Sequence, residues 1–119
     1  MSALVTVVPK AYDLALWLIL RVNEFPPSQR FALGQRMDNT ALDLLDLLVE
    51  AQFERDKQDL LRRANLTLVR LRHLVRLAND LHVLGARRYE FASEHLEELG
   101  RMVGGWAKHE KTRPRDGER

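Results

Sequence analysis

The chain has 119 residues, a formal net charge of +2 and no cysteine. Hydrophobic residues make up 45% of it and charged residues 30%, which is enough apolar content for one modest core. The absence of cysteine excludes a disulfide framework, a thiolate metal site and a thiol nucleophile. With only 6 glycines and 4 prolines, the composition favours long regular elements over a loop-rich β-fold. It indicates a small helical domain and does not point to an activity.

Four amphipathic helices are predicted along the chain. After a lead-in over residues 1–9, the first helix runs from about Lys10 to Phe25, where two prolines end it. Ser28 is placed to cap the second helix, and a boundary over residues 54–59 precedes the third. The third helix ends towards Gly85, a natural C-terminal stop. The fourth covers about residues 87–108, so the bundle spans residues 10–110.

Apolar residues recur at spacings of three and four in these segments, as helices with one buried face require. The second helix places Phe31, Gly34, Met37, Ala41, Leu44, Leu48 and Ala51 on one seam. The fourth does the same with Tyr89, Ala92, Leu96, Leu99, Val103 and Trp106. Short links between the segments predict an all-α, up-and-down four-helix bundle. The tail over residues 111–119 has no apolar residue and is expected to be disordered.

The third helix carries apolar residues on two faces. One broad face, which includes Leu61, Leu68 and Leu71, suits the bundle core. The opposite face mixes arginines with Leu66, Val69, Leu77 and Leu84, which a monomer would leave in water. The first helix repeats the pattern. If Tyr12, Leu16, Ile19 and Val22 face the core, then Leu14, Trp17 and Leu18 point elsewhere. We therefore predict self-association through Leu14, Trp17, Leu18, Leu66, Val69, His73 and Leu77.

The charge is distributed unevenly along the sequence. Residues 1–54 hold 4 basic and 7 acidic side chains, whereas residues 55–119 hold 15 basic and 10 acidic ones. Arginine accounts for 15 of the 19 basic residues, and its planar guanidinium suits phosphate recognition. The pattern is compatible with a surface for a polyanion, and also with helix faces that are simply solvated. Self-association would gather the arginines into one array and favour binding of a polyanion by counterion release.

No motif for catalysis, a cofactor or a metal is found. None of the four histidines follows a glutamate by three residues, and neither a phosphate-binding loop nor a nucleophile elbow is present. The acidic residues between Asp38 and Glu50 could bind a divalent cation, but a solvated or salt-bridged face is favoured. The apolar run over residues 14–20 is too short to span a membrane, and no signal peptide is evident. We therefore expect a non-enzymatic, cytoplasmic binding protein without catalytic, metal or cofactor residues.

Two stretches resemble a known superfamily of four-helix bundles. The run over residues 25–36 (FPPSQRFALGQR) is similar to the first helical junction in that superfamily, which includes proteins encoded in 23S ribosomal RNA intervening sequences. The runs LRRAN at 61–65, LRHLVRL at 71–77, RYEF at 88–91 and GRMVGGW at 100–106 resemble the accessory variability determinant (Avd) branch. Avd proteins serve diversity-generating retroelements. The similarity covers about residues 9–109.

The resemblance implies a homopentameric barrel with a positively charged surface. It also implies that the protein binds nucleic acid and is a non-enzymatic partner of the element's reverse transcriptase. The two proteins would take part together in error-prone copying of template RNA during mutagenic retrohoming. On this sequence the basic surface would comprise Arg62, Arg63, Arg70, Arg72, Arg76, Arg87, Arg88 and Arg101. Each of these arginines could instead form a surface or interface ion pair. The residues Gly104, Gly105 and Trp106 are expected to serve packing.

Two other readings stay open at this stage. One is a protein of the ribosomal-insert type, although the run that we would look for late in the second helix is missing from residues 40–51. The other is a structural protein–protein adaptor whose arginines pair with acidic residues across subunits. Salt-insensitive assembly without RNA binding would distinguish the adaptor from the retroelement protein.

Overall fold

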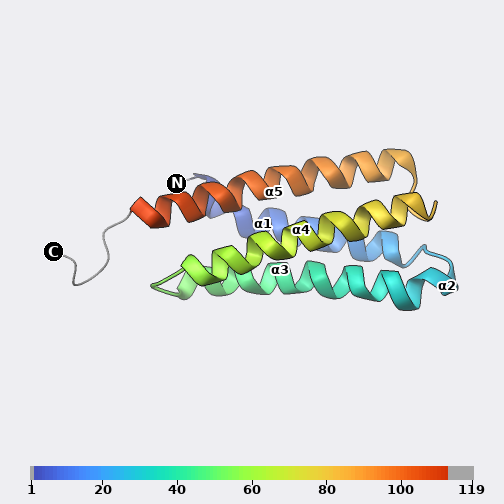
Figure 1. Ribbon diagram of the computed structural model, residues 1–119, viewed down its shortest axis with the longest axis horizontal. Coiled ribbons are helices and arrows are strands. Elements are labelled where there is room, and N and C mark those ends of the chain that lie inside the picture. Colours follow the sequence, from blue (N-terminus) through green and yellow to red (C-terminus); the bar gives the residue numbers. More distant parts are fainter. Residues whose placement is uncertain (1, 113–119) are drawn as a thin grey trace.

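The computed structural model describes the backbone of residues 2–112 and the side chains of residues 6–112 (Figure 1). This part of the chain is entirely helical: α1 (Ser2–Val22), α2 (Pro27–Gln29), a π-helical segment η1 (Arg30–Gly34), α3 (Gln35–Phe53), α4 (Gln58–Asp80) and α5 (Ala86–Thr112). The short α2 and η1 lead directly into α3, so the fold consists of four long helical rods. Successive rods run in opposite directions, which confirms the predicted up-and-down four-helix bundle.

Each long helix packs against two others. Helix α1 lies against α3 and α5, and α4 also lies against α3 and α5. The helices α1 and α4 therefore occupy opposite corners of the bundle, and their outward faces point in opposite directions. This diagonal arrangement determines which surfaces a second molecule could contact.

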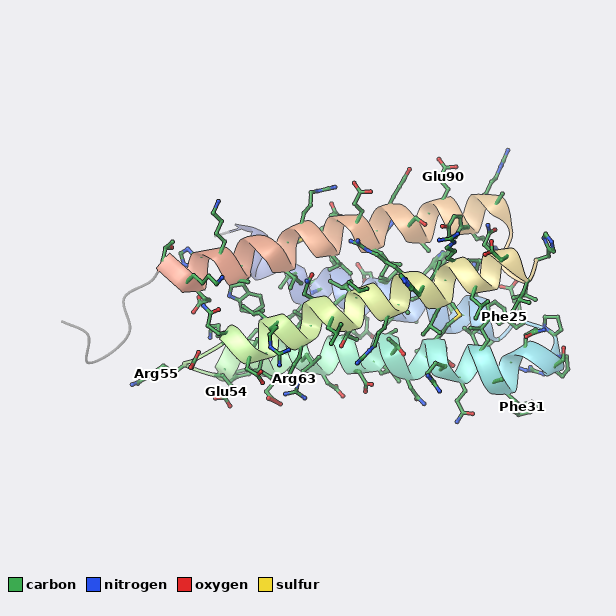
Figure 2. All side chains as sticks on the ribbon, in the orientation of Figure 1. Phe25, Phe31, Glu54, Arg55, Arg63 and Glu90 are labelled. Carbon is green, nitrogen blue, oxygen red and sulfur yellow. The ribbon has the colours of Figure 1, made fainter. Side chains whose placement is uncertain are left out.

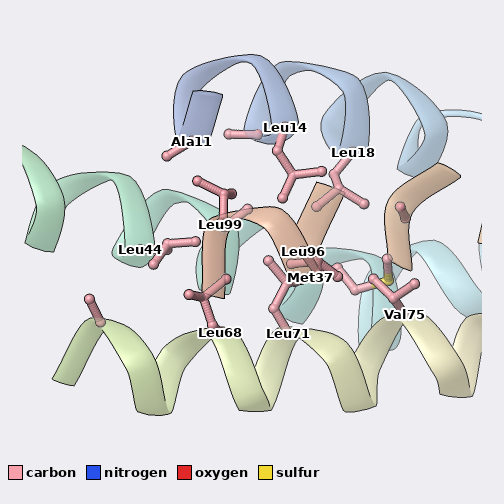
Figure 3. Close-up of a cluster of buried hydrophobic side chains, with 14 of the residues drawn as sticks. Ala11, Leu14, Leu18, Met37, Leu44, Leu68, Leu71, Val75, Leu96 and Leu99 are labelled. Atoms are coloured by element: carbon pink, nitrogen blue, oxygen red, sulfur yellow. The ribbon is translucent and has the colours of Figure 1, made fainter. Parts of the chain in front are cut away.

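The core is formed by the buried seams of all four long helices (Figure 3). Leu18 of α1, Met37 of α3, Leu71 of α4 and Leu96 of α5 are all completely buried and meet within this cluster. The seams predicted for the last three rods are confirmed, apart from Leu74 of α4, which is partly buried, and two other members. Tyr89 is only partly buried, and Phe31 is 75% exposed and points away from the bundle (Figure 2).

The sequence-based assignment of faces on the first helix is confirmed at Val22, which is buried, but is wrong for most of the helix. Leu14 is 3% exposed and Leu18 is completely buried, so these predicted interface residues belong to the core. Tyr12 and Leu16, which were expected in the core, are exposed instead. The residues at 14–20 are apolar on every side of the helix, so hydrophobic spacing does not define one buried face.

Two predicted helix boundaries also differ from the structure. Helix α1 begins at Ser2, with Pro9 inside it, rather than near Lys10. Helix α4 ends at Asp80, and the turn that follows uses positive backbone φ angles at His82 (61°) and Gly85 (97°). The turn redirects Leu84, which was predicted to be exposed, into the core at 4% exposure. Of the predicted tail, residues 111 and 112 continue α5, and residues 113–119 lie outside the described part.

The π-helical segment brings two helices unusually close together. A Cβ atom built on Gly34, the last residue of η1, would lie 2.6 Å from Cγ1 of Val22 at the end of α1. Only a residue without a side chain fits at this distance, because both positions belong to the packed junction around Phe25. Gly34 therefore fixes how closely the second rod approaches the first.

Candidate nucleic-acid interface

Helix α4 carries most of the predicted basic residues along its solvent-facing sides. The side chain of Arg62 is 69% exposed and that of Arg76 is 75% exposed. Arg63 is exposed as well and lies near the end of the bundle where α3 and α4 are joined (Figure 2). Guanidinium groups in this setting can exchange water for phosphate oxygens at little cost.

Several of these arginines form ion pairs with carboxylates of their own helix. Arg62 and Arg63 share Asp59, at N–O distances of 2.9 and 3.7 Å. On the same helix Arg76 lies 3.9 Å from Asp80, and on α5 an ion pair of 2.9 Å joins Arg101 to Glu97. Exposed pairs at this spacing each contribute about 0.3–0.5 kcal/mol. They do not prevent an arginine from binding a phosphate.

The remaining arginines differ in their surroundings. Arg88 makes an ion pair of 2.9 Å with Glu24, and this pair joins the start of α5 to the turn after α1. Among the described side chains, neither Arg70 nor Arg87 has an ion-pair partner. Of these three, Arg70 and Arg87 are therefore the most available to an external anion.

Arg72 has a packing role that its charge alone does not indicate. Its Nη2 donates a hydrogen bond of 3.1 Å to the carbonyl oxygen of Leu96 on α5. The guanidinium lies over Gly100, where an added Cβ would come within 2.4 Å of the same nitrogen. The absence of a side chain at Gly100 leaves the space that this arginine occupies. Arg72 thus connects α4 to α5, although the residue as a whole is exposed.

A groove of about 490 Å³ separates the arginines of α4 from an acidic face of α3. Asp43, Asp46 and Glu50 line its α3 side. Arg62, Arg63 and Arg70 line the opposite side, together with Leu66 and Thr67. Within the described residues no ion pair crosses this groove, so the two charged faces are close without being locked together.

The structure therefore divides the predicted basic residues into separate groups rather than one patch. Arg63 and Arg70 belong to the α3 side of α4, whereas Arg62 lines both the groove towards α3 and a pocket towards α5. Arg72 and Arg76 belong to its α5 side, where they line a second pocket with His73. The other three lie along α5 at Arg87, Arg88 and Arg101.

Exposed apolar residues occupy the outer faces of the two diagonal helices. On α4 these are Leu66, Val69 and Leu77, as predicted, with exposed His73 among them. On α1 they are Tyr12, Leu16 and Leu20, which replace the buried pair at 14 and 18 as the candidate contact residues. These three residues are four positions apart, as residues on one face of a helix are. The spacing alone did not predict this α1 stripe, because the helix is apolar on its other sides too.

Trp17 contacts helix α5 within the protomer. Its ring lies 4.7 Å from the ring of Phe91, which stacks at 4.1 Å on the imidazole of His95. The guanidinium carbon of Arg21 lies 5.5 Å from the Trp17 ring centre, in cation–π contact. Trp17 is thus half-buried in a contact between α1 and α5, and the predicted interface role is not its only use. The RYEF run contains Phe91, but its sequence did not predict the ring contacts with Trp17 and His95.

The glycine-rich run of α5 has a divided role. Trp106 is buried, as expected for a packing residue. A Cβ atom added at Gly104 or Gly105 would meet nothing within 4 Å, so neither glycine is needed for packing inside the protomer. Gly104 instead lines a shallow apolar pocket of about 460 Å³ between α4 and α5.

Two carboxyl groups have perturbed acidity. Burial raises the pKa of Asp38, whose buried Oδ1 atom has no hydrogen-bond partner among the described residues. The hydrogen bond of 2.9 Å from Lys10 lowers the pKa of Glu98 on α5. No group of three histidine or acidic side chains converges as a metal site would require, within the part of the chain that the structure describes. Within residues 2–112, no helix has both the length and the apolar character needed to cross a bilayer.

The fold and its charged surface define the class of the molecule: a small four-helix bundle that presents accessible arginines on one helix. Over residues 5–110 the sequence matches the bAvd-like family, and the chain belongs to that family. It is an Avd-type accessory protein. Among curated proteins, no relative matches the sequence.

Proposed function

We propose that this protein is the accessory subunit of a diversity-generating retroelement. In this role it binds template RNA and the element's reverse transcriptase in the cytoplasm and supports mutagenic retrohoming without catalysing a reaction itself. The observation that carries the proposal is the exposure of the α4 arginines, of which Arg62, Arg63 and Arg76 form only weak ion pairs within their own helix. The family match supports the same role.

Phosphate binding by these arginines is energetically reasonable. A hydrogen bond to a charged group contributes about 1.5–3 kcal/mol. This is more than an exposed ion pair within a helix contributes, which is about 0.3–0.5 kcal/mol. An RNA backbone also releases condensed counterions when arginines approach it. Arg70, without a carboxylate partner in the described part, is the best candidate for a direct phosphate contact.

A filter-binding titration with template RNA tests the role of this side of α4. The double variant Arg63→Glu, Arg70→Glu should bind RNA at least tenfold more weakly. The matched control Arg30→Glu, Lys108→Glu reverses two charges elsewhere and should lose much less. Affinity of the unmodified protein should also fall steeply with added salt. Equal losses in both variants, or no RNA binding by the unmodified protein, would overturn the assignment.

We further propose that the protein assembles as a closed ring of five, with α1 of one subunit against α4 of the next. The outward apolar residues on these diagonal helices face in opposite directions, which suits a head-to-tail interface. The contact residues would be Tyr12, Leu16, Leu20, Leu66, Val69, His73 and Leu77. The arginines on the two flanks of α4 would stay accessible beside the interface. The number five comes from the family resemblance.

Two measurements test the assembly and the polymerase contact. Light scattering should give a mass near 69 kDa, five times the 13.8 kDa of one chain. Purified reverse transcriptase from the neighbouring gene should co-elute with the protein on size exclusion. A lone protomer at micromolar concentration, or a genome with no reverse transcriptase gene nearby, would argue against this function and favour a protein–protein adaptor.

A further inference from the structure

A pocket between α4 and α5 combines several groups that bind anions. Its volume is about 240 Å³, and its walls are formed mainly by polar side chains. Helix α4 supplies Arg72, His73 and Arg76, and α5 supplies Tyr89 and Ser93. Guanidinium and hydroxyl groups are hydrogen-bond donors, so one small space brings together four donor side chains besides His73, which the assembly proposed above would place in the subunit contact.

Arg72 is held in place before any ligand arrives. Its hydrogen bond to the Leu96 carbonyl uses one N–H group of a guanidinium that has five. Gly100 leaves the space that the guanidinium occupies. Because the side chain is already ordered, binding an anion at Arg72 costs less conformational entropy than binding at a freely rotating arginine.

The two hydroxyl groups in the pocket have unused hydrogen-bonding capacity. Tyr89 and Ser93 are both partly buried. Neither hydroxyl has a hydrogen-bond partner elsewhere in the part of the chain that the structure describes. A helical serine often donates to the carbonyl one turn earlier, and Ser93 does not. Both hydroxyls can therefore donate to a ligand.

The charge balance of the pocket favours an anion. Arg76 lies 3.9 Å from Asp80, which is longer than a hydrogen bond, and its side chain is exposed. The one carboxylate that lines the pocket belongs to Glu97, and Arg101 neutralises it at 2.9 Å. Arg72 therefore has no carboxylate partner among the described residues, and Arg76 has only its loose, exposed pair with Asp80.

From this arrangement we propose that the pocket is a phosphate-binding site. It accepts a single tetrahedral phosphate group, with Arg72 and Arg76 supplying charge and the hydroxyls of Tyr89 and Ser93 supplying neutral donors. The phosphate comes either from a nucleic-acid backbone or from a small phosphorylated compound. The nucleic-acid source rests on the function proposed above, whereas the binding of inorganic phosphate does not.

Inorganic phosphate is the first probe. Its binding is detected by ¹⁵N NMR of the full chain at constant ionic strength. Amide signals around residues 72–76 and 89–97 should shift with phosphate and not with chloride. Arg76→Gln should weaken binding about tenfold, as expected for the loss of one charged hydrogen bond. The matched control Lys108→Gln removes one positive charge from an exposed position of α5 outside the pocket and should leave binding unchanged. Equal weakening by both variants, or no shifts, would overturn the site.

A second variant keeps the charge and changes only the geometry. Gly100→Ala places a methyl group where the Arg72 guanidinium lies and should displace that flexible group without unfolding α5. Phosphate affinity should fall several-fold although the net charge is unchanged. Ser93→Ala should also weaken binding, with thermal unfolding unchanged. Unaltered affinity in both variants would mean that only general electrostatic attraction acts here, and would overturn the proposal.

Single-stranded RNA is the second probe and separates the two sources of phosphate. If the backbone enters the pocket, Arg76→Gln should lower the slope of log affinity against log salt by about 0.7. Phosphate binding that is lost in Arg76→Gln without any change in RNA affinity would support a small phosphorylated ligand. RNA binding that depends on Arg63 and Arg70 but no phosphate binding would overturn the pocket and leave the proposed function. Phosphate binding by a protein that binds no RNA would support the pocket and overturn the proposed function.

Discussion

Leu16→Ala and Leu18→Ala form a matched pair that tests the orientation of α1. The two leucines are two positions apart, yet Leu18 is completely buried while Leu16 is 49% exposed. Alanine removes the equivalent of three carbon groups from each side chain. At about 0.8 kcal/mol per buried CH₂ group, the transfer cost at position 18 is about 2.4 kcal/mol, and the cavity raises the total to about 3–4 kcal/mol.

This free energy corresponds to a readily measured change in melting temperature. An unfolding entropy of about 2.1 cal/mol/K per residue gives about 250 cal/mol/K for the 119 residues. The loss at Leu18 should therefore lower Tm by about 12–16 °C. Leu16→Ala should change the free energy of unfolding of an isolated protomer by only about 1 kcal/mol, because about half of its side chain is exposed and its removal leaves no enclosed cavity.

Circular dichroism at several protein concentrations, together with light scattering, gives both readouts. Leu18→Ala should lower Tm at every concentration. Leu16→Ala should instead weaken the assembly and make Tm depend more strongly on concentration. A loss of protomer stability at position 16 as large as that at position 18 would show that the assignment of buried and exposed faces is wrong.

Three further changes test other parts of the structure. Gly34→Ala should destabilise the fold by about 1–3 kcal/mol because its Cβ would overlap Val22, whereas Gly105→Ala, in open space on α5, should raise stability by up to about 1 kcal/mol. Chemical denaturation measures both free energies of unfolding, and equal effects would contradict the close approach of Gly34 to Val22. Asp38→Asn should raise Tm at pH 7, because the raised pKa of Asp38 means that its ionised form opposes folding. The gain in Tm should disappear as the pH falls below the pKa that the Asp38 carboxyl has in the unfolded chain, and a gain that persists in acid would refute this cause. Lys10→Met should lower Tm near neutral pH, because the lowered pKa of Glu98 marks a pair that stabilises only while that carboxylate is ionised, and thermal scans should show the difference vanishing in acid as Glu98 protonates.

The sequence predicted the helices well where one face is clearly apolar. The buried seams of α4 and α5 follow directly from leucines and alanines spaced among charged residues, as at Leu68 and Leu99. Helix α1 could not be oriented in this way, because alternative apolar faces fit equally well. Leu84 shows a second limit, since helical projection does not extend beyond Asp80, where the backbone leaves the helix.

The candidate site was predictable in composition but not in arrangement. Charge alone indicated that the arginines of α4 would be exposed, and most of them are. Arg72 could not be distinguished from its neighbours, because its role depends on Gly100, which is 28 positions away in sequence and lies on another helix. Glu24, the partner of Arg88, is likewise distant in sequence. Such pairings depend on the relative rotation of packed helices, which hydrophobic spacing does not determine.

The π-helical segment at Arg30–Gly34 has a consequence for the evolution of the chain. A π-turn accommodates one residue more than an α-turn, because its hydrogen bonds join residues five positions apart instead of four. Deleting one residue here would restore regular α-helix and rotate the exposed Phe31 by about 100° relative to α3. The same deletion inside α3 would move Met37 and Leu44 off the core. Length changes among homologous sequences should therefore accumulate at this segment, and Phe31 should vary with them.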